Sequence, residues 1–164
     1  MTEHEAKVEA NEQLAYEYLK EITPKNWTVT RSTNKYERFD VTVSNGNYSF
    51  IAENKIRNFN YENNPYGEYA LVDVSKIENL KKMDENARVI SFFPANNAIF
   101  SHKVKDSYKW EKRWVECKKN SFSKEKVWKY EYFLPTTDEY RVDYDIDISD
   151  GLTRLEELKD KLCK

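Results

Sequence analysis

Asp40, Glu53 and Lys55 are the residues of this sequence whose types and spacing best fit chemistry on a phosphate ester. Carboxylates are the hard oxygen ligands that Mg²⁺ prefers, and this ion uses one or two of them while it keeps several waters. Bound Mg²⁺ polarises a phosphate and activates water, and a nearby lysine can face the charge that develops on phosphorus. The three residues therefore predict hydrolysis of phosphodiesters with magnesium as cofactor and manganese as its substitute.

The Glu-x-Lys spacing of Glu53 and Lys55 carries no weight alone. The same spacing recurs at Glu5/Lys7, Glu116/Lys118 and Glu157/Lys159. What distinguishes this copy is Asp40, which lies on the expected partner strand. The alternative is a solvated face of ion pairs, which are common on surfaces and contribute little to stability.

A β-hairpin is expected to bring Asp40 to the other two residues. Alternating apolar and polar residues flank Asn45 and Gly46, and an Asn-Gly pair in this setting favours a two-residue turn. With that turn, Ser44 pairs with Asn47.

This pairing predicts which residues share a face of the hairpin. Asp40 falls opposite Ile51, so alternation puts Asp40, Glu53, Lys55 and Arg57 on one face, where Arg57 can hold a phosphate oxygen. The other face is expected to be core and collects Phe39, Val41, Val43, Tyr48, Phe50 and Ala52.

Helices and strands are expected to alternate around this hairpin. Helical periodicity covers residues 5–22 and 152–162, and Ser75 with Glu78 fits a capping box that opens a helix through about Met83. Residues 58–68 are typical of an exposed loop. Strands are expected at residues 27–30, 88–94 and 98–104, and residues 127–134 and 140–148 alternate like a second strand pair.

Composition favours a globular chain. The 164 residues suit one domain, 1–164, with a core at about 5–104 and a basic, aromatic-rich β/α extension at about 105–164. The apolar runs are too short to span a bilayer, and no signal peptide is expected. Cys117 and Cys163 lack partners at zinc-ligand spacing, so a cytoplasmic setting is expected.

Positive charge gathers in one segment, although the formal net charge is -2. Residues 101–130 carry ten Lys or Arg against four acids, interleaved with aromatic residues. Cations meet phosphates and aromatic rings stack on unpaired bases, so Lys109, Lys112 and Arg113 are candidate nucleic-acid contacts. The equally weighted alternative is an amphipathic insertion whose Trp residues belong to the core.

Residues 35–41 and 51–57 resemble the two halves of the motif of the PD-(D/E)xK nuclease superfamily, with Phe39 in place of the proline. The superfamily includes restriction endonucleases, Holliday-junction resolvases and small phage nucleases. The resemblance implies an α+β fold with a restriction-endonuclease-like αβββαβ core and mixed central sheet, here followed by a C-terminal β extension and terminal helix. It also implies that Asp40 and Glu53 bind metal beside Lys55. On the same resemblance, Glu12 on the first helix is a further candidate metal ligand, and Lys76 on the helix after the hairpin is a candidate nucleic-acid contact.

The expected activity is that of a magnesium-dependent DNA endonuclease, in the host cytoplasm if the chain is phage-encoded. DNA is the expected partner, membranes are not, and a homodimer is compatible with the family. The alternative is a catalytically silent nuclease-fold module that binds DNA or a protein partner.

Overall fold

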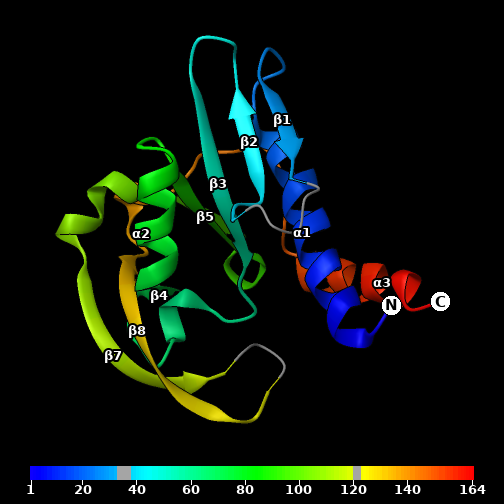
Figure 1. Ribbon diagram of the computed structural model, residues 1–164. Helices are drawn as coiled ribbons and strands as arrows, with labels where there is room; N and C mark the ends of the chain where they lie inside the picture. The colour runs from blue at the N-terminus through cyan, green and yellow to red at the C-terminus, as the bar shows by residue number, and fades with distance from the viewer. Residues whose placement is uncertain (33–37, 120–122) are drawn as a thin grey trace.

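The computed structural model describes residues 1–32, 38–119 and 123–164, so residues 35–37 of the motif lie outside the described residues. A five-stranded sheet, sheet A, has the strand order β1-β2-β3-β5-β6 (Figure 1). Its strands are β1 (Thr28–Arg31), β2 (Val41–Ser44), β3 (Ser49–Ile56), β5 (Arg88–Phe93) and β6 (Ala98–Lys103). β3 and β5 are parallel and the other neighbours are antiparallel, so the expected α+β class with a mixed sheet is confirmed.

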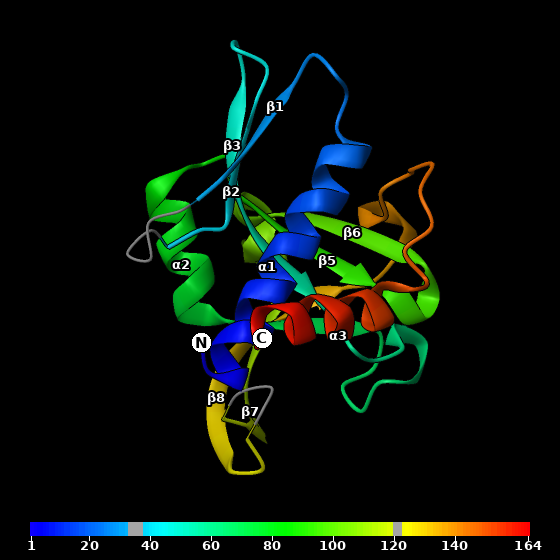
Figure 2. The same cartoon turned by 90° about the vertical axis from the view of Figure 1, so that its right-hand side faces the viewer.

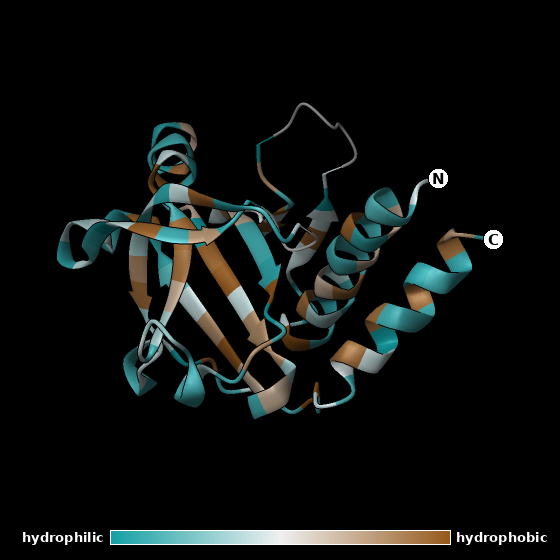
Figure 3. Cartoon of the chain, turned by 90° about the horizontal axis from the view of Figure 1, so that it is seen from below, coloured by the Kyte–Doolittle hydropathy of each residue, from teal (hydrophilic) through white to brown (hydrophobic). Residues whose placement is uncertain are grey.

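Helices cover both faces of sheet A. Helices α1 (Glu3–Ile22) and α3 (Gly151–Leu162) pack together on one face, and α2 (Val74–Met83) covers the other (Figures 1 and 2). Val89 and Phe93 of β5 point into the core on the α2 side, whereas Ile90 and Phe92 point into the core on the α1 side. Apolar residues accordingly concentrate on the strands and on the inward sides of the helices (Figure 3). A strand buried on both faces needs a nearly continuous apolar run.

The helix boundaries agree with the periodicity, but the capping box lies elsewhere. Thr2 and Glu5 cap α1 reciprocally, because Thr2 Oγ1 accepts from the Glu5 amide and the Glu5 carboxylate accepts from the Thr2 amide. Helix α2 begins at Val74, after Asp73, so Ser75 lies inside it and the predicted box is wrong. The Glu78 carboxylate instead accepts from the Tyr132 hydroxyl at 2.6 Å. This contact with Tyr132 takes the place of the capping interaction that the sequence predicts for Glu78.

The loop of the hairpin is longer than predicted. Residues 45–48 connect β2 and β3, and the Asn45 side chain accepts from the amides of Asn47 and Tyr48 at 2.9 and 2.8 Å. Within this loop only Gly46 has a positive φ, 93°. A type I′ turn needs positive φ at both central residues, so the Asn45 side chain stabilises a four-residue loop instead.

The longer loop shifts every cross-strand pair by two residues. Val41 lies opposite Ala52, so continuing the register by one residue puts Asp40 opposite Glu53 and not opposite Ile51. Because side chains alternate with period two, the shift leaves Asp40 and Glu53 on the same face.

The predicted core face of the hairpin is only partly correct. Val41, Val43 and Ala52 are buried on the α1 side, and Phe50 packs at its margin. Tyr48 is exposed because it belongs to the loop, and Phe39 lies before β2 and packs against the core on the α2 side. The opposite face is also covered, by α2, so the acidic residues are not on a solvated face.

A second sheet, sheet B, was predicted with the wrong partners. Strand β8 (Lys126–Pro135) pairs antiparallel with β7 (Glu111–Lys118) and β4 (Tyr69–Asp73), in the order β4-β8-β7. β4 directly follows the expected loop and was missed, although its alternating burial is typical of a strand.

Residues 140–148 do not pair with β8. They begin along the edge strand β6 of sheet A, where Arg141 forms an isolated bridge with Phe100. Asn97, which has a φ of 47°, accepts hydrogen bonds from the Tyr144 hydroxyl and the Ile148 amide. These bonds to Asn97 hold the segment against sheet A, which the alternation of its residues does not reveal.

Short 3₁₀ helices complete the described chain. They are η1 (Tyr61–Asn63), η2 (Pro94–Asn96), η3 (Val104–Lys109) and η4 (Asp138–Tyr140). The segment 58–68 is irregular as expected, yet Tyr61 is buried there, with Phe93 and Phe100 at 5.3 and 5.1 Å between ring centroids. Within the described residues, no helix combines the length and apolar character needed to span a membrane.

Candidate active site

The candidate site lies just beyond the end of β2, where β3 remains paired with β5. β2 pairs with β3 only from Val41 onward, whereas β3 pairs with β5 through Ile56. Asp40 bends away at this point, while its amide still donates to the Ala52 carbonyl at 2.9 Å. Its Oδ2 accepts from the Asn54 amide at 2.7 Å. The aspartate therefore caps the open edge of β3.

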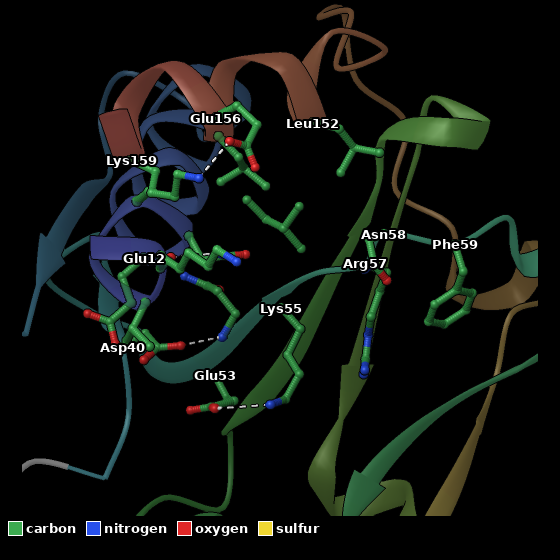
Figure 4. A pocket seen from close by; sticks show the side chains of 17 residues that line it. Glu12, Asp40, Glu53, Lys55, Arg57, Asn58, Phe59, Leu152, Glu156 and Lys159 are labelled. Atoms are coloured by element: carbon green, nitrogen blue, oxygen red, sulfur yellow. Dashed lines mark hydrogen bonds and ion pairs between the residues drawn. The ribbon is translucent and has the colours of Figure 1, made fainter. Parts of the chain in front are cut away.

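A cavity of about 630 Å³ opens at this edge. It is bounded by the N-terminal half of α1, by β3 and by the first turns of α3 (Figure 4). Asp40, Glu53, Lys55 and Glu12 all line it. Its volume is in the range of small-ligand sites. The structure thus brings the three predicted catalytic residues to one cavity.

Negative charge is concentrated between Asp40 and Glu53. Glu53 is only 8% exposed. Burial, and then the neighbouring Glu53 carboxylate, raise the pKa of Asp40 to about 7, against the opposing effect of the Asn54 amide. A divalent cation would relieve this repulsion, and two carboxylates are a donor set that Mg²⁺ accepts. The residues present therefore fit a hard divalent ion.

Two lysines approach Glu53. Lys76 Nζ on α2 lies 3.4 Å from one carboxylate oxygen, and Lys55 Nζ lies 3.8 Å from the other. Burial, and then the nearby Arg57, lower the pKa of Lys55. Because Glu53 is buried and has two cations beside it, the arrangement differs from a solvated row of surface ion pairs.

Glu12 reaches the cavity wall, but an arginine holds it. Arg31 Nη2 donates to the Glu12 carboxylate at 3.1 Å, and its guanidinium also binds Glu9 with two contacts of 2.7 Å and Gln13 at 2.9 Å. Across residues 1–32, 38–119 and 123–164, no group of three or more His, Cys, Asp or Glu side chains is arranged to hold a metal. Glu12 as a third ligand stays a prediction.

Arg57 is expected from the sequence to bind a phosphate oxygen, but in the structure its guanidinium contacts sheet B. Its Nη2 donates to the Leu71 carbonyl of β4 at 3.1 Å, and its Nε is buried without a partner. Burial lowers the pKa of Arg57 to about 10, with Glu131 opposing. Its guanidinium therefore ties β3 to sheet B, although the residue also lines the cavity.

Three other predicted nucleic-acid contacts, Lys109, Lys112 and Arg113, lie on sheet B and its approach, and not among the residues that line the cavity. Lys109, at the end of η3, lies over the Tyr108 ring, and Lys112 on β7 lies over Tyr132. Arg113 lies 4.1 Å from the centroid of the Phe133 ring and pairs with a glutamate of its own strand. Their role in binding nucleic acid stays a prediction.

Three cavity residues were missed by sequence reasoning. Lys7 and Lys159 enter from α1 and α3, and Lys159 pairs with Glu156 at 2.9 Å. The packing of α3 on α1 brings these two lysines to the cavity, and the sequence of neither helix predicts that packing. The side-chain oxygen and nitrogen of Asn54 are buried without partners at the cavity. The position of Asn54 between Glu53 and Lys55 is the sequence feature that could have identified it as a cavity residue.

Comparisons with known proteins give a likeness of fold. No protein-family model matches the sequence, and no curated protein matches it either. Among solved structures, the chain is similar to Hjc, a Holliday junction resolvase from the archaeal hyperthermophile Archaeoglobus fulgidus. The TM-score is 0.49 at 13% sequence identity, over 83% of this chain and 97% of that one.

Proposed function

We propose that this protein is a divalent-metal-dependent nuclease that cleaves phosphodiester bonds within DNA. The observation that supports the proposal is the convergence of Asp40, Glu53 and Lys55 on one cavity at the open edge of β3. Acids are rarely buried beside one another unless a cation or a function compensates.

Asp40 and Glu53 would hold the divalent ion through their carboxylate oxygens. The Asn54 amide fixes one oxygen of Asp40, which leaves the other oxygen for the ion. When bound, the ion polarises a phosphate oxygen and lowers the pKa of water. Mg²⁺ keeps several waters, so two protein ligands suffice.

Lys55 would orient the attacking water and stabilise the charge that develops on phosphorus. Its lowered pKa brings the amine closer to accepting a proton from that water. Lys76 would pair with Glu53 from α2, 3.4 Å away, and so hold that carboxylate in its orientation. Lys76 is a positioning residue in this scheme.

Cleavage of a DNA panel tests the proposal. Linear duplex, single strands, branched DNA and four-way junctions are incubated with Mg²⁺ or Mn²⁺, and EDTA provides the blank. Asp40→Ala and Lys55→Ala should abolish cleavage, while Lys25→Ala, an exposed lysine of the same charge, should cleave normally. Wild-type cleavage by either cavity variant would refute the assignment.

The second candidate is a silent module that binds DNA without cutting it. Metal-linked stability separates the two, because an ion that binds only the folded state stabilises it by about 2.7 kcal/mol at a hundredfold excess over Kd. The melting temperature should rise with Mg²⁺ or Mn²⁺ and should not rise in Glu53→Gln. A protein that binds DNA but gives neither shift nor cleavage is the silent module.

A further inference from the structure

An aromatic and basic face covers the outer part of the β7–β8 hairpin. Trp114 pairs with Tyr130, Glu116 with Trp128, and Lys118 with Lys126 across the two strands. Paired residues and their second neighbours share a face. This ribbon face therefore comprises Lys112, Trp114, Glu116, Lys118, Lys126, Trp128 and Tyr130, all of which are exposed.

The aromatic rings of the ribbon face lie in solvent. Trp114 is 64% exposed, Trp128 65% and Tyr130 38%, whereas Trp110, just before β7, is 6% exposed. The chain thus uses one Trp of this segment as core and leaves two outside. Exposed large aromatic groups gathered on one face mark an interaction site.

Two of the rings stack on each other and form an aromatic platform together with Trp128. The Trp114 and Tyr130 rings are stacked, with centroids 5.1 Å apart and planes 25° apart. Trp128 stands on the same face one pair further toward the hairpin end. The sheet backbone beneath fixes the spacing of the rings, so little conformational entropy is lost when a flat ligand stacks on them.

Cations border this platform at both ends. Lys112 Nζ lies 6.0 Å from the centroid of the Tyr130 ring, and Lys118 and Lys126 face each other beyond Trp128. The three lysines outnumber the one acid, Glu116, so the face carries a net charge of +2. Lysine is depleted in the cores of protein interfaces, which disfavours a protein partner. A ligand that matches this face has flat groups that stack on the rings and anionic groups that meet the lysines. The bases and phosphates of a nucleic acid have this arrangement.

Base pairing determines which nucleic acid fits. The faces of bases are covered by stacking inside a duplex, so exposed rings can stack only on unpaired bases. The platform would be unused on intact duplex, where only the three lysines would contribute.

We propose that the ribbon face binds unpaired DNA strands, with bases stacked on Trp114, Trp128 and Tyr130 and phosphates near Lys112, Lys118 and Lys126. The inference rests on the proposed function, because it names a part of the substrate: DNA that carries a single-stranded segment beside the bond that is cut. The adjoining ends of β7 and β8, near Lys118 and Lys126, lie lower than the N-terminal half of α1 in two perpendicular views (Figures 1 and 2), and that half of α1 lines the cavity.

Equilibrium binding in EDTA tests the inference without cleavage. A labelled oligothymidylate, its duplex of equal length and an oligouridylate are titrated at one salt concentration. The oligothymidylate should bind more tightly than the duplex and should quench Trp fluorescence. Trp114→Ala and Trp128→Ala should each weaken its binding about 5- to 150-fold and leave duplex binding nearly unchanged.

Matched variants separate binding from folding. Tyr48→Ala removes an aromatic ring that is 37% exposed in the β2–β3 loop, outside the ribbon face, and should bind like wild type. Trp114→Phe and Trp128→Phe keep a stacking ring and should retain more affinity than the alanine variants, at equal unfolding midpoints.

Three results would overturn the inference: equal affinity for duplex and single strand, wild-type affinity in both alanine variants, or tighter binding of the oligouridylate. Lys25→Ala, which removes an exposed lysine outside the cavity and the ribbon face, should bind the oligothymidylate normally. A protein that binds strands through the ribbon face but never cleaves refutes the proposed nuclease alone, and cleavage without strand preference refutes the ribbon face alone.

Discussion

Acid should weaken the junction between the two sheets through His102. This residue of β6 is 0% exposed, and its Nε2 lies 2.7 Å from the Pro135 carbonyl at the end of β8. Because a carbonyl only accepts, Nε2 carries the hydrogen. Nδ1 is buried without a partner. A second proton would therefore place an unpaired positive charge inside the protein.

The magnitude follows from the pKa of His102. Burial, and to a smaller extent the nearby Arg57, lower it from the usual 6.5 to about 4, against the effect of the Pro135 carbonyl. The unfolded chain thus binds a proton between pH 6.5 and 4, where the folded chain does not. The stabilisation from neutral His102 is complete above pH 6.5 and is lost as the pH falls, by about 2.5 kcal/mol at pH 4.5.

Buried carboxyl groups act in the opposite direction. Burial and the adjacent Asp73 raise the pKa of Glu131 from 4.5 to about 8, so the folded state binds a proton that the unfolded state releases within that window. Acidification from pH 8 to 4.5 therefore stabilises the fold through Glu131. The total pH profile mixes both effects, and the informative quantity is the difference between wild type and a variant of His102.

His102→Gln keeps a donor for the Pro135 carbonyl but does not titrate. Urea unfolding at pH 7.5 and 4.5 should show that wild type loses about 2.5 kcal/mol more than this variant over the interval. His102→Phe should likewise lack this pH dependence. Its free energy of unfolding should also be lower by about 1–3 kcal/mol at both pH values, because the Pro135 carbonyl is left unpaired. Parallel profiles for wild type and His102→Gln would refute the reasoning.

Three further outcomes follow from packing and polar contacts. Gly151→Ala should lower the free energy of unfolding by about 1–3 kcal/mol in urea titrations, since a Cβ there would lie 2.8 Å from Pro94 Cγ. Asn54→Leu should raise the stability of the metal-free protein by about 1–2 kcal/mol in the same assay, because it removes two buried polar atoms without partners. Arg31→Gln should release Glu12 and tighten Mg²⁺ binding in calorimetric titrations; unchanged affinity would exclude Glu12 as a ligand.

The sequence predicted those parts of the fold that local pattern determines. Helices α1, α2 and α3 and strands β5 and β6 fall where periodicity and alternation put them. The partners of β8 could not be predicted, because residues 111–118 and 140–148 both alternate. Contacts of Asn97 with Tyr144 and Ile148 determine that the later segment packs against sheet A. Such a contact joins residues far apart in the chain, and no single strand encodes it.

The predicted grouping of Asp40 with Glu53 remained correct although the predicted strand register was wrong. Which face a side chain occupies depends only on whether the register shifts by an even or an odd number of residues. A shift of one residue would have turned Asp40 to the opposite face, but the Asn45 side chain lengthened the loop by two residues and preserved the alternation. Glu12 had no such protection. Helical spacing places it beside the cavity, yet the choice between a metal and Arg31 is a competition between side chains. That competition is decided by free energies of binding and not by spacing, so Arg31 is the residue whose replacement would change the affinity of the proposed site for a metal.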